Sequence, residues 1–264
     1  MTAVLAPLGA LRMLSGFKVL LPFAALIAVW WTIKIAAGIS DEVLVSPATA
    51  FAAFLRLVTT GVLSEYASTS LRMIGVSALL SLAVGVPIGF AVGVNRYAAR
   101  SLEGFLRFLQ GISGIAWLPL AIIWFGFSYV TTMVVVIYTL IVPIVFNTMI
   151  GVRTIPENYV LALRSLGAGR LRLVTDVYLP GAMPSIVVGL RLGMGYGWRA
   201  LIAAEMLVRR GGLGDLIFSA RTFNQIDRIL VGMIVIGCLY IVVDRLIIQP
   251  IENLTIARWG VLRK

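Results

Sequence analysis

A run of 45 residues without an Asp, Glu, Lys or Arg occupies positions 108–152. The hydrocarbon core of a bilayer is about 30 Å thick, and about 20 apolar helical residues cross it. The run is therefore too long for one crossing. Its Phe-Gly-Phe-Ser sequence at 125–128 is typical of a turn. We predict two membrane-spanning helices folded back at this turn.

The rest of the chain has the same character. Of the 264 residues, 60% are hydrophobic and only 12% are charged, with a mean hydropathy of +1.02. Helix-length apolar runs, without short alternating segments, favour an all-α transmembrane helical bundle over a β-barrel. We predict one domain, 1–264, with its core bundle at about 65–250. The six expected spans are about 17–37, 73–94, two within 108–152, 181–206 and 229–248.

The segments outside the spans have distinct patterns. The start of the chain resembles a signal peptide, but it has no persuasive cleavage site, so we expect an uncleaved first span. Ser46 and Pro47 are typical of a helix start, here of an amphipathic interfacial helix. Residues 95–107 are expected to form a cytoplasmic loop, and the last span is expected to stop near Pro250.

The charge balance is strongly basic, with 22 Lys and Arg against 11 Asp and Glu. In a soluble protein this would suggest nucleic acid as a partner. Here the segments expected inside carry more Lys and Arg than those expected outside, which predicts cytoplasmic termini and no nucleic-acid partner. Histidine is absent and Cys238 is the only cysteine. An intrachain disulfide is therefore impossible and a His/Cys metal site implausible.

A charged segment at 154–180 interrupts the apolar pattern. Pro156 and Glu157 suit the first turn of a helix, and Gly167 and Gly169 permit a sharp reversal. A second short helix is expected to end at Pro180. This shape suits docking into a groove of another protein, and it offers no nucleophile–base pair for catalysis. A plain orientation signal between two spans is the alternative interpretation.

This segment resembles the coupling motif of permease subunits from binding-protein-dependent ABC importers. That motif is Glu-Ala-Ala, three residues, Gly, nine residues and Ile-x-Leu-Pro. The matching positions are Ala162, Gly167, Leu179 and Pro180, with Val177 in place of isoleucine. Two positions depart from the motif, because Leu161 replaces the glutamate and Leu163 the second alanine. Leu161 would then supply apolar contact where the glutamate would form a salt bridge.

The resemblance extends over nearly the whole chain from residue 43. Segments such as IAWLPLAIIWFG, IVPIVFNTMIGVR and LPGAMPSIVVGLRLGMG are similar to the nitrate, sulfonate, taurine and bicarbonate branch of these permeases. The resemblance implies a type I ABC importer (MetI-like) fold in a bacterial inner membrane. It also implies a second copy of the chain, two cytoplasmic ATPase subunits and an external substrate-binding protein. By the same analogy, 211–225 would form the outer gate.

The resemblance implies that a set of coupling residues docks in a cleft of the ATPase. They are Leu161, Ala162, Leu163, Arg164, Ser165, Leu166, Gly167, Ala168, Val177, Leu179 and Pro180. The chain has no Gly-x-x-x-x-Gly-Lys-Ser/Thr phosphate loop. We therefore expect no cofactor on this chain, and ATP-Mg on the partner ATPase.

Arg199 is the main candidate for the substrate pathway. An arginine within a span is costly unless it faces a cavity or a partner, and its guanidinium suits a carboxylate, nitrate or sulfonate. Alternatively it snorkels outward or pairs with an acid of another span. Trp117 and Asn147 are further candidates, for which packing and an interhelical hydrogen bond are the favoured alternatives. Glu205 is a candidate as well, although its spacing makes it a poor partner for Arg199 on the same helix.

Two rival functions would each require sequence features of their own. A self-sufficient secondary transporter or channel predicts intramembrane acids for ion coupling, or an inverted repeat, and neither is evident. A membrane enzyme needs an acid/base or metal cluster, which a chain without histidine does not offer.

Overall fold

The computed structural model describes residues 8–259, and their side chains from 21 to 255. The described residues form helices joined by turns, without a strand. Four helices are long and apolar enough to cross a membrane: α3 (Val62–Val94), α6 (Tyr129–Arg153), and the continuous helices Arg170–Val208 and Ile226–Thr255. The prediction of an all-α transmembrane bundle is confirmed.

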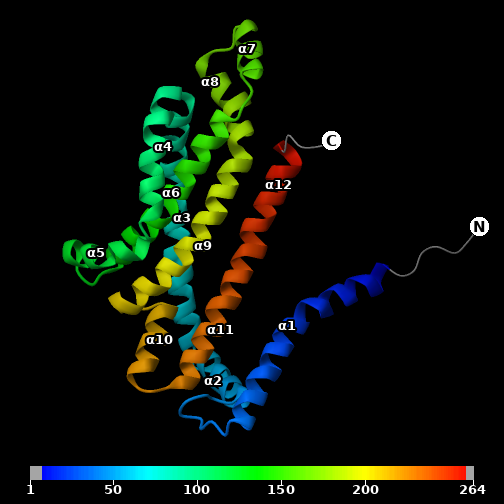
Figure 1. Ribbon diagram of the computed structural model, residues 1–264, viewed down its shortest axis with the longest axis vertical. Coiled ribbons are helices and arrows are strands. Elements are labelled where there is room, and N and C mark those ends of the chain that lie inside the picture. Colours follow the sequence, from blue (N-terminus) through cyan, green and yellow to red (C-terminus); the bar gives the residue numbers. More distant parts are fainter. Residues whose placement is uncertain (1–7, 260–264) are drawn as a thin grey trace, which may run out of the picture.

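Helix α6 is the centre of the bundle, packed between α3 and α9 (Leu179–Val208) (Figure 1). Leu140 and Ile144 of α6, together with Trp198 of α9, belong to the main buried cluster. Glycines allow the backbones to approach closely. A Cβ atom on Gly89 of α3 would lie 2.7 Å from the Cβ of Thr148, so only glycine fits there.

Residues 95–107 do not form the expected loop, because this segment begins the helix α4 (Arg96–Gly111), whereas its cytoplasmic location stays a prediction. The Asn95 side chain accepts hydrogen bonds from the backbone N–H groups of Tyr97 and Ala98, at 3.0 and 3.2 Å, and so caps the helix start. Ala99 and Leu106 are buried in a cluster with residues of α6. The polar sequence therefore forms a surface helix with one apolar face.

The expected third span is strongly bent. Helix α4 ends at Gly111, and the chain continues through a 3₁₀ turn (Gly114–Trp117) into α5 (Leu118–Phe125), with an 80° bend between the two halves. The predicted turn at 125–128 is present, because Gly126 adopts a φ of 65° and Ser128 caps α6. Counting this bent pair as one span gives five among the described residues.

Two prolines expected to end helices lie inside them. Pro180 follows the π turn Val174–Tyr178, which joins α8 (Arg170–Leu173) to α9. Pro250 follows the π turn Asp244–Ile248, which joins α11 (Ile226–Val243) to α12 (Gln249–Trp259). A π turn shifts the backbone hydrogen bonds by one residue, and this accommodates a residue that has no N–H.

Helix α2 (Pro47–Thr59) confirms the expected helix start, since the Ser46 side chain accepts a hydrogen bond from the Thr49 N–H. Helix α1 (Leu8–Ala36) covers most of the predicted first span, but its described side chains, Leu21–Ala36, form only a short apolar helix. The first crossing therefore stays a prediction. The chain ends, on which the prediction of cytoplasmic termini also depends, lie outside the described residues.

Candidate functional site

The segment 154–180 projects from one end of the bundle (Figure 1). Helix α7 (Glu157–Ser165) follows Pro156, as the sequence predicts. Gly167 adopts a left-handed φ of 75°, and its N–H donates to the Arg164 carbonyl at 2.9 Å. The N–H of Ala168 donates to the Leu163 carbonyl at 3.1 Å. These bonds complete a glycine-dependent helix end, so α7 and α8 form a hairpin.

The tip of this hairpin presents apolar side chains to its surroundings. Leu166 is 83% exposed and Leu161 is 52% exposed, and Leu171 on α8 is also exposed. Val160, in contrast, is buried. An exposed apolar group among charged residues is typical of a protein–protein contact. We call α7, the Gly167 turn and α8 the tip hairpin.

The candidate coupling residues divide between two places. The stretch 161–168 lies on the tip hairpin, whereas Val177 lies in the π turn, and Leu179 and Pro180 begin α9. The second helix of the tip hairpin, α8, is therefore the first part of the long continuous helix Arg170–Val208. Arg199 lies on the same helix, about 40 Å from α8 at the usual helical rise of about 1.5 Å per residue.

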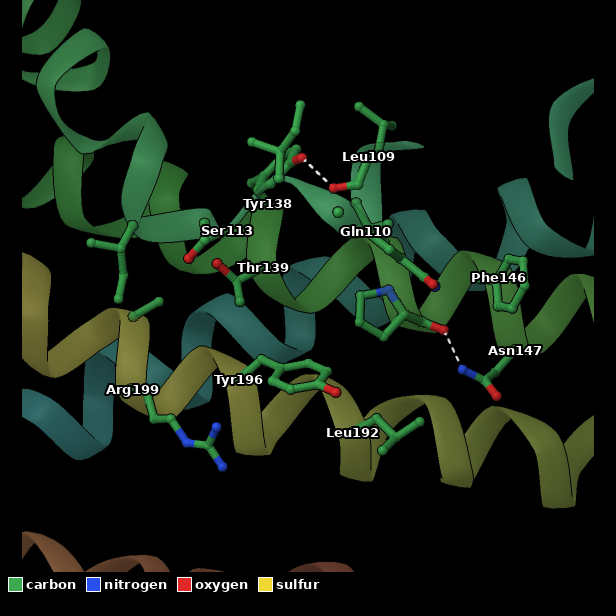
Figure 2. Close-up of a pocket in the computed structure, with 17 residues that line it drawn as sticks. Leu109, Gln110, Ser113, Tyr138, Thr139, Phe146, Asn147, Leu192, Tyr196 and Arg199 are labelled. Atoms are coloured by element: carbon green, nitrogen blue, oxygen red, sulfur yellow. Dashed lines mark hydrogen bonds between the residues drawn. The ribbon is translucent and has the colours of Figure 1, made fainter. Parts of the chain in front are cut away.

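A cavity of about 570 Å³ lies between the bend after α4, helix α6 and helix α9. Arg199 and Asn147 both line it at opposite ends of the view, with Tyr196 between them (Figure 2). The polar residues of its wall also include Gln110, Ser113, Tyr138 and Thr139. The Tyr138 hydroxyl donates to the Leu109 carbonyl at 2.8 Å, which holds the end of α4 against α6.

Among the described residues, Arg199 is the only charged one that lines the cavity. Its Cζ atom lies 6.0 Å from the centre of the Tyr196 ring, within reach of a cation–π interaction. Its side chain makes no salt bridge with any residue that the structure describes. Of the alternatives, pairing with an acid of another described span is therefore not observed.

Asn147 differs from the favoured expectation, whereas Trp117 is packed as the favoured alternative predicted. The Asn147 side-chain amide donates to the Pro143 carbonyl of its own helix at 2.8 Å, so this bond lies within α6 and does not join two helices. Trp117 packs its ring 5.3 Å from the Tyr138 ring and is absent from the cavity wall. Of these two residues, Asn147 alone joins Arg199 at the cavity.

The structure does not bring Glu205 to this cavity. Glu205 is only 2% exposed, and its carboxyl group accepts hydrogen bonds from the Ser70 hydroxyl and the Gly214 N–H. The predicted outer-gate segment 211–225 contains α10 (Leu213–Thr222), at the opposite end of the bundle from the tip hairpin (Figure 1). Glu205 thus holds the start of α10.

Residues 85–247 match the family described as "Binding-protein-dependent transport system inner membrane component". This chain belongs to that family. The permease is 31% identical to the taurine transport system permease protein TauC of Escherichia coli (strain K12), over 81% of its own length and 80% of that protein. It is 35% identical to the bicarbonate transport system permease protein CmpB of Synechococcus elongatus, over 62% of its length and 59% of that protein.

Other relatives are named for aliphatic sulfonate and nitrate transport. The predicted branch of permeases is therefore confirmed. A solved chain of the MetNI methionine ABC transporter, in an inward-facing conformation, is 20% identical and superposes with a TM-score of 0.50. The match covers 69% of the permease and 92% of that chain, and it shows the fold alone.

Sequence reasoning missed the part of the cavity wall that comes from the bend at 109–115. The signal was present as a Gly-Ile-Ser-Gly sequence inside the uncharged run. A Cβ atom on Gly114 would collide with the Thr139 hydroxyl, so the bend packs tightly against α6. Two glycines in an apolar run are typical of such a break and close approach.

Proposed function

We propose that two copies of this permease form a pathway for a small anion, delivered by an external binding protein and driven inward by a cytoplasmic ATPase. Family membership supports the permease role and the two kinds of partner. The proposed coupling to the ATPase rests on one observation: the tip hairpin exposes the side chains of Leu161 and Leu166. In this proposal the ATPase covers these side chains.

Movement would pass from the ATPase to the spans through one helix. The tip hairpin continues into Arg170–Val208, and the π turn Val174–Tyr178 provides a position where this helix can bend. ATP-driven closure of two ATPase subunits would draw the two hairpins together. The spans would then alternate between inward-open and outward-open states. ATP-Mg would bind to the ATPase, with no cofactor on this chain.

The proposed substrate class rests on the cavity at Arg199. A guanidinium group binds planar or tetrahedral oxyanions through paired, charge-assisted hydrogen bonds. Ser113 and Asn147 add neutral polar groups at other points of the wall, and none of the described residues that line this cavity is acidic. A carboxylate, nitrate, sulfonate or bicarbonate fits these surroundings. Weak binding by one arginine also suits a pathway that must release its substrate.

Site-specific cross-linking tests the coupling proposal. In a Cys238→Ser background, Leu166→Cys should cross-link to the co-expressed ATPase through a short bifunctional reagent. Tyr97→Cys is the matched control, because Tyr97 is equally exposed at 83%, lies on α4 and is outside the tip hairpin. Equal cross-linking at both positions, or none at Leu166→Cys in an assembled complex, would contradict the proposal.

The alternative function is a self-sufficient secondary transporter or channel. It would need no partner at the tip hairpin, and the exposed leucines would have no role in transport. Uptake by the permease without an ATPase would favour it.

A further inference from the structure

A second cavity, of about 530 Å³, lies between the tip hairpin and the bundle. Its walls come from the ends of α3 and α6, the start of α4, helix α7 and the π turn before α9. Four arginines line it: Arg96, Arg100, Arg153 and Arg164. Glu157 is the single acidic residue among the described residues that line it.

The internal ion pairs leave this cavity strongly positive. Arg96 lies 3.4 Å from Glu157, and Arg153 lies 2.9 Å from Glu103 on α4. Neither Arg100 nor Arg164 makes a salt bridge within the described part of the chain. Two guanidinium groups, from α4 and α7, are therefore available to an anion in the same cavity.

We propose that this cavity binds a phosphate group. Phosphate is multiply charged and carries several acceptor oxygens, so it can engage arginines from two helices at once. A simple monovalent anion would use only one of the two guanidinium groups that make no salt bridge within the described residues. The volume also exceeds that of one phosphate, which leaves room for the rest of a phosphorylated molecule.

The phosphate could come from two sources, a phospholipid head group or a soluble phosphate. Basic pockets between membrane spans on the cytoplasmic side are typical sites for anionic head groups. The exposed apolar side chain of Val94, at the cavity, would also tolerate the start of an acyl chain. The chemistry that the arginines recognise is the same in both cases.

A bound phosphate would connect the tip hairpin to the spans. Arg164 belongs to α7, whereas Arg100 belongs to α4 and Arg153 to α6. Contacts to these arginines would restrain α7 against the bundle. A consequence for coupling to the ATPase rests on the proposed function, but the binding itself does not.

The test uses the full-length permease in a non-ionic maltoside detergent, which contains no phosphate. Binding of radiolabelled inorganic phosphate and of short-chain phosphatidylglycerol is measured for the wild type and three variants. Arg100→Gln/Arg164→Gln should weaken binding at least tenfold. Arg170→Gln/Arg172→Gln removes the same charge from exposed residues of α8 outside the cavity, and it should stay within twofold of the wild type. Glu157→Gln should tighten binding severalfold.

Comparing the two probes also identifies whether the bound phosphate belongs to a lipid or to a soluble molecule. Tighter binding of phosphatidylglycerol than of inorganic phosphate assigns the site to a lipid head group, and the reverse assigns it to a soluble phosphate. The proposal is overturned if the wild type binds neither probe saturably, or if both double variants lose binding equally. Should Arg100→Gln/Arg164→Gln fail to fold, the Glu157→Gln result decides, and unchanged affinity there contradicts the proposal.

Discussion

The Ser70 hydroxyl donates a hydrogen bond to the buried Glu205 carboxyl group at 2.8 Å, joining α3 to α9. The same hydroxyl oxygen accepts the Leu213 N–H at 2.9 Å, and Glu205 accepts the Gly214 N–H at 3.0 Å. Two otherwise unpaired N–H groups at the start of α10 are thereby satisfied. This network fixes α10 at the end of the bundle opposite the tip hairpin.

Ser70→Ala should destabilise the permease by about 1–2 kcal/mol, because it leaves a buried carboxyl group and a backbone N–H short of a partner. The thermal unfolding midpoint in detergent measures this effect. Ser64→Ala is the control, since Ser64 is exposed and its hydroxyl bonds only the carbonyl of Gly61, the residue before its own helix. Equal midpoints for both variants would show that the network contributes little.

Gly167→Ala should weaken association with the ATPase. A φ of 75° costs a residue with a Cβ atom roughly 1–2 kcal/mol, which would distort the end of α7. Gly169→Ala lies two residues away at a φ of −72° and has open space around its Cβ position, so it should associate normally. Co-purification of the ATPase with each variant measures the difference. Normal co-purification of the ATPase with Gly167→Ala would show that the Gly167 turn is not needed for association with the ATPase.

Leu166→Ser should lower ATPase association at least tenfold while leaving the unfolding midpoint unchanged, because this side chain is exposed in the permease alone. Its loss removes apolar area only from the proposed interface. Tyr97→Ser, equally exposed on α4, is the control. A fall in the unfolding midpoint of Leu166→Ser would instead assign Leu166 a role in folding.

Arg199→Gln should reduce transport of an anionic substrate roughly 30- to 150-fold, corresponding to about 2–3 kcal/mol of charge-assisted hydrogen bonding. Arg199→Lys should retain part of the activity, because it keeps the charge but loses the paired geometry. Arg72→Gln removes an exposed charge outside the cavity and should transport normally. ATPase activity stimulated by the binding protein, measured alongside, separates substrate passage from coupling.

The sequence predicted the features that depend on hydropathy and on a few glycines that mark turns. The uncharged run at 108–152 predicted the turn at Gly126, and the motif around Gly167 predicted the hairpin. A chain reversal needs a residue that tolerates a left-handed φ, and glycine marks that position directly. Arg199 was identified because a charge inside a span needs a cavity or a partner.

The errors arose where tertiary packing or backbone adjustment overrides local rules. Helix α4 has a polar sequence, but Ala99 and Leu106 pack on α6 and stabilise it. Pro180 and Pro250 were expected to end helices, yet a π turn before each one lets the helix continue. The partners of Glu205 lie 135 residues earlier in the chain, at Ser70, and beyond the end of its own helix, so no local pattern could reveal them.

Uphill uptake into sealed vesicles tests the central claim most directly. The permease is reconstituted alone, and then with its ATPase, its binding protein and ATP, and accumulation of a labelled anion is followed over time. We predict concentrative uptake only in the complete system, and none by the permease alone even with an imposed ion gradient. Sustained uphill accumulation by the permease alone would contradict the account.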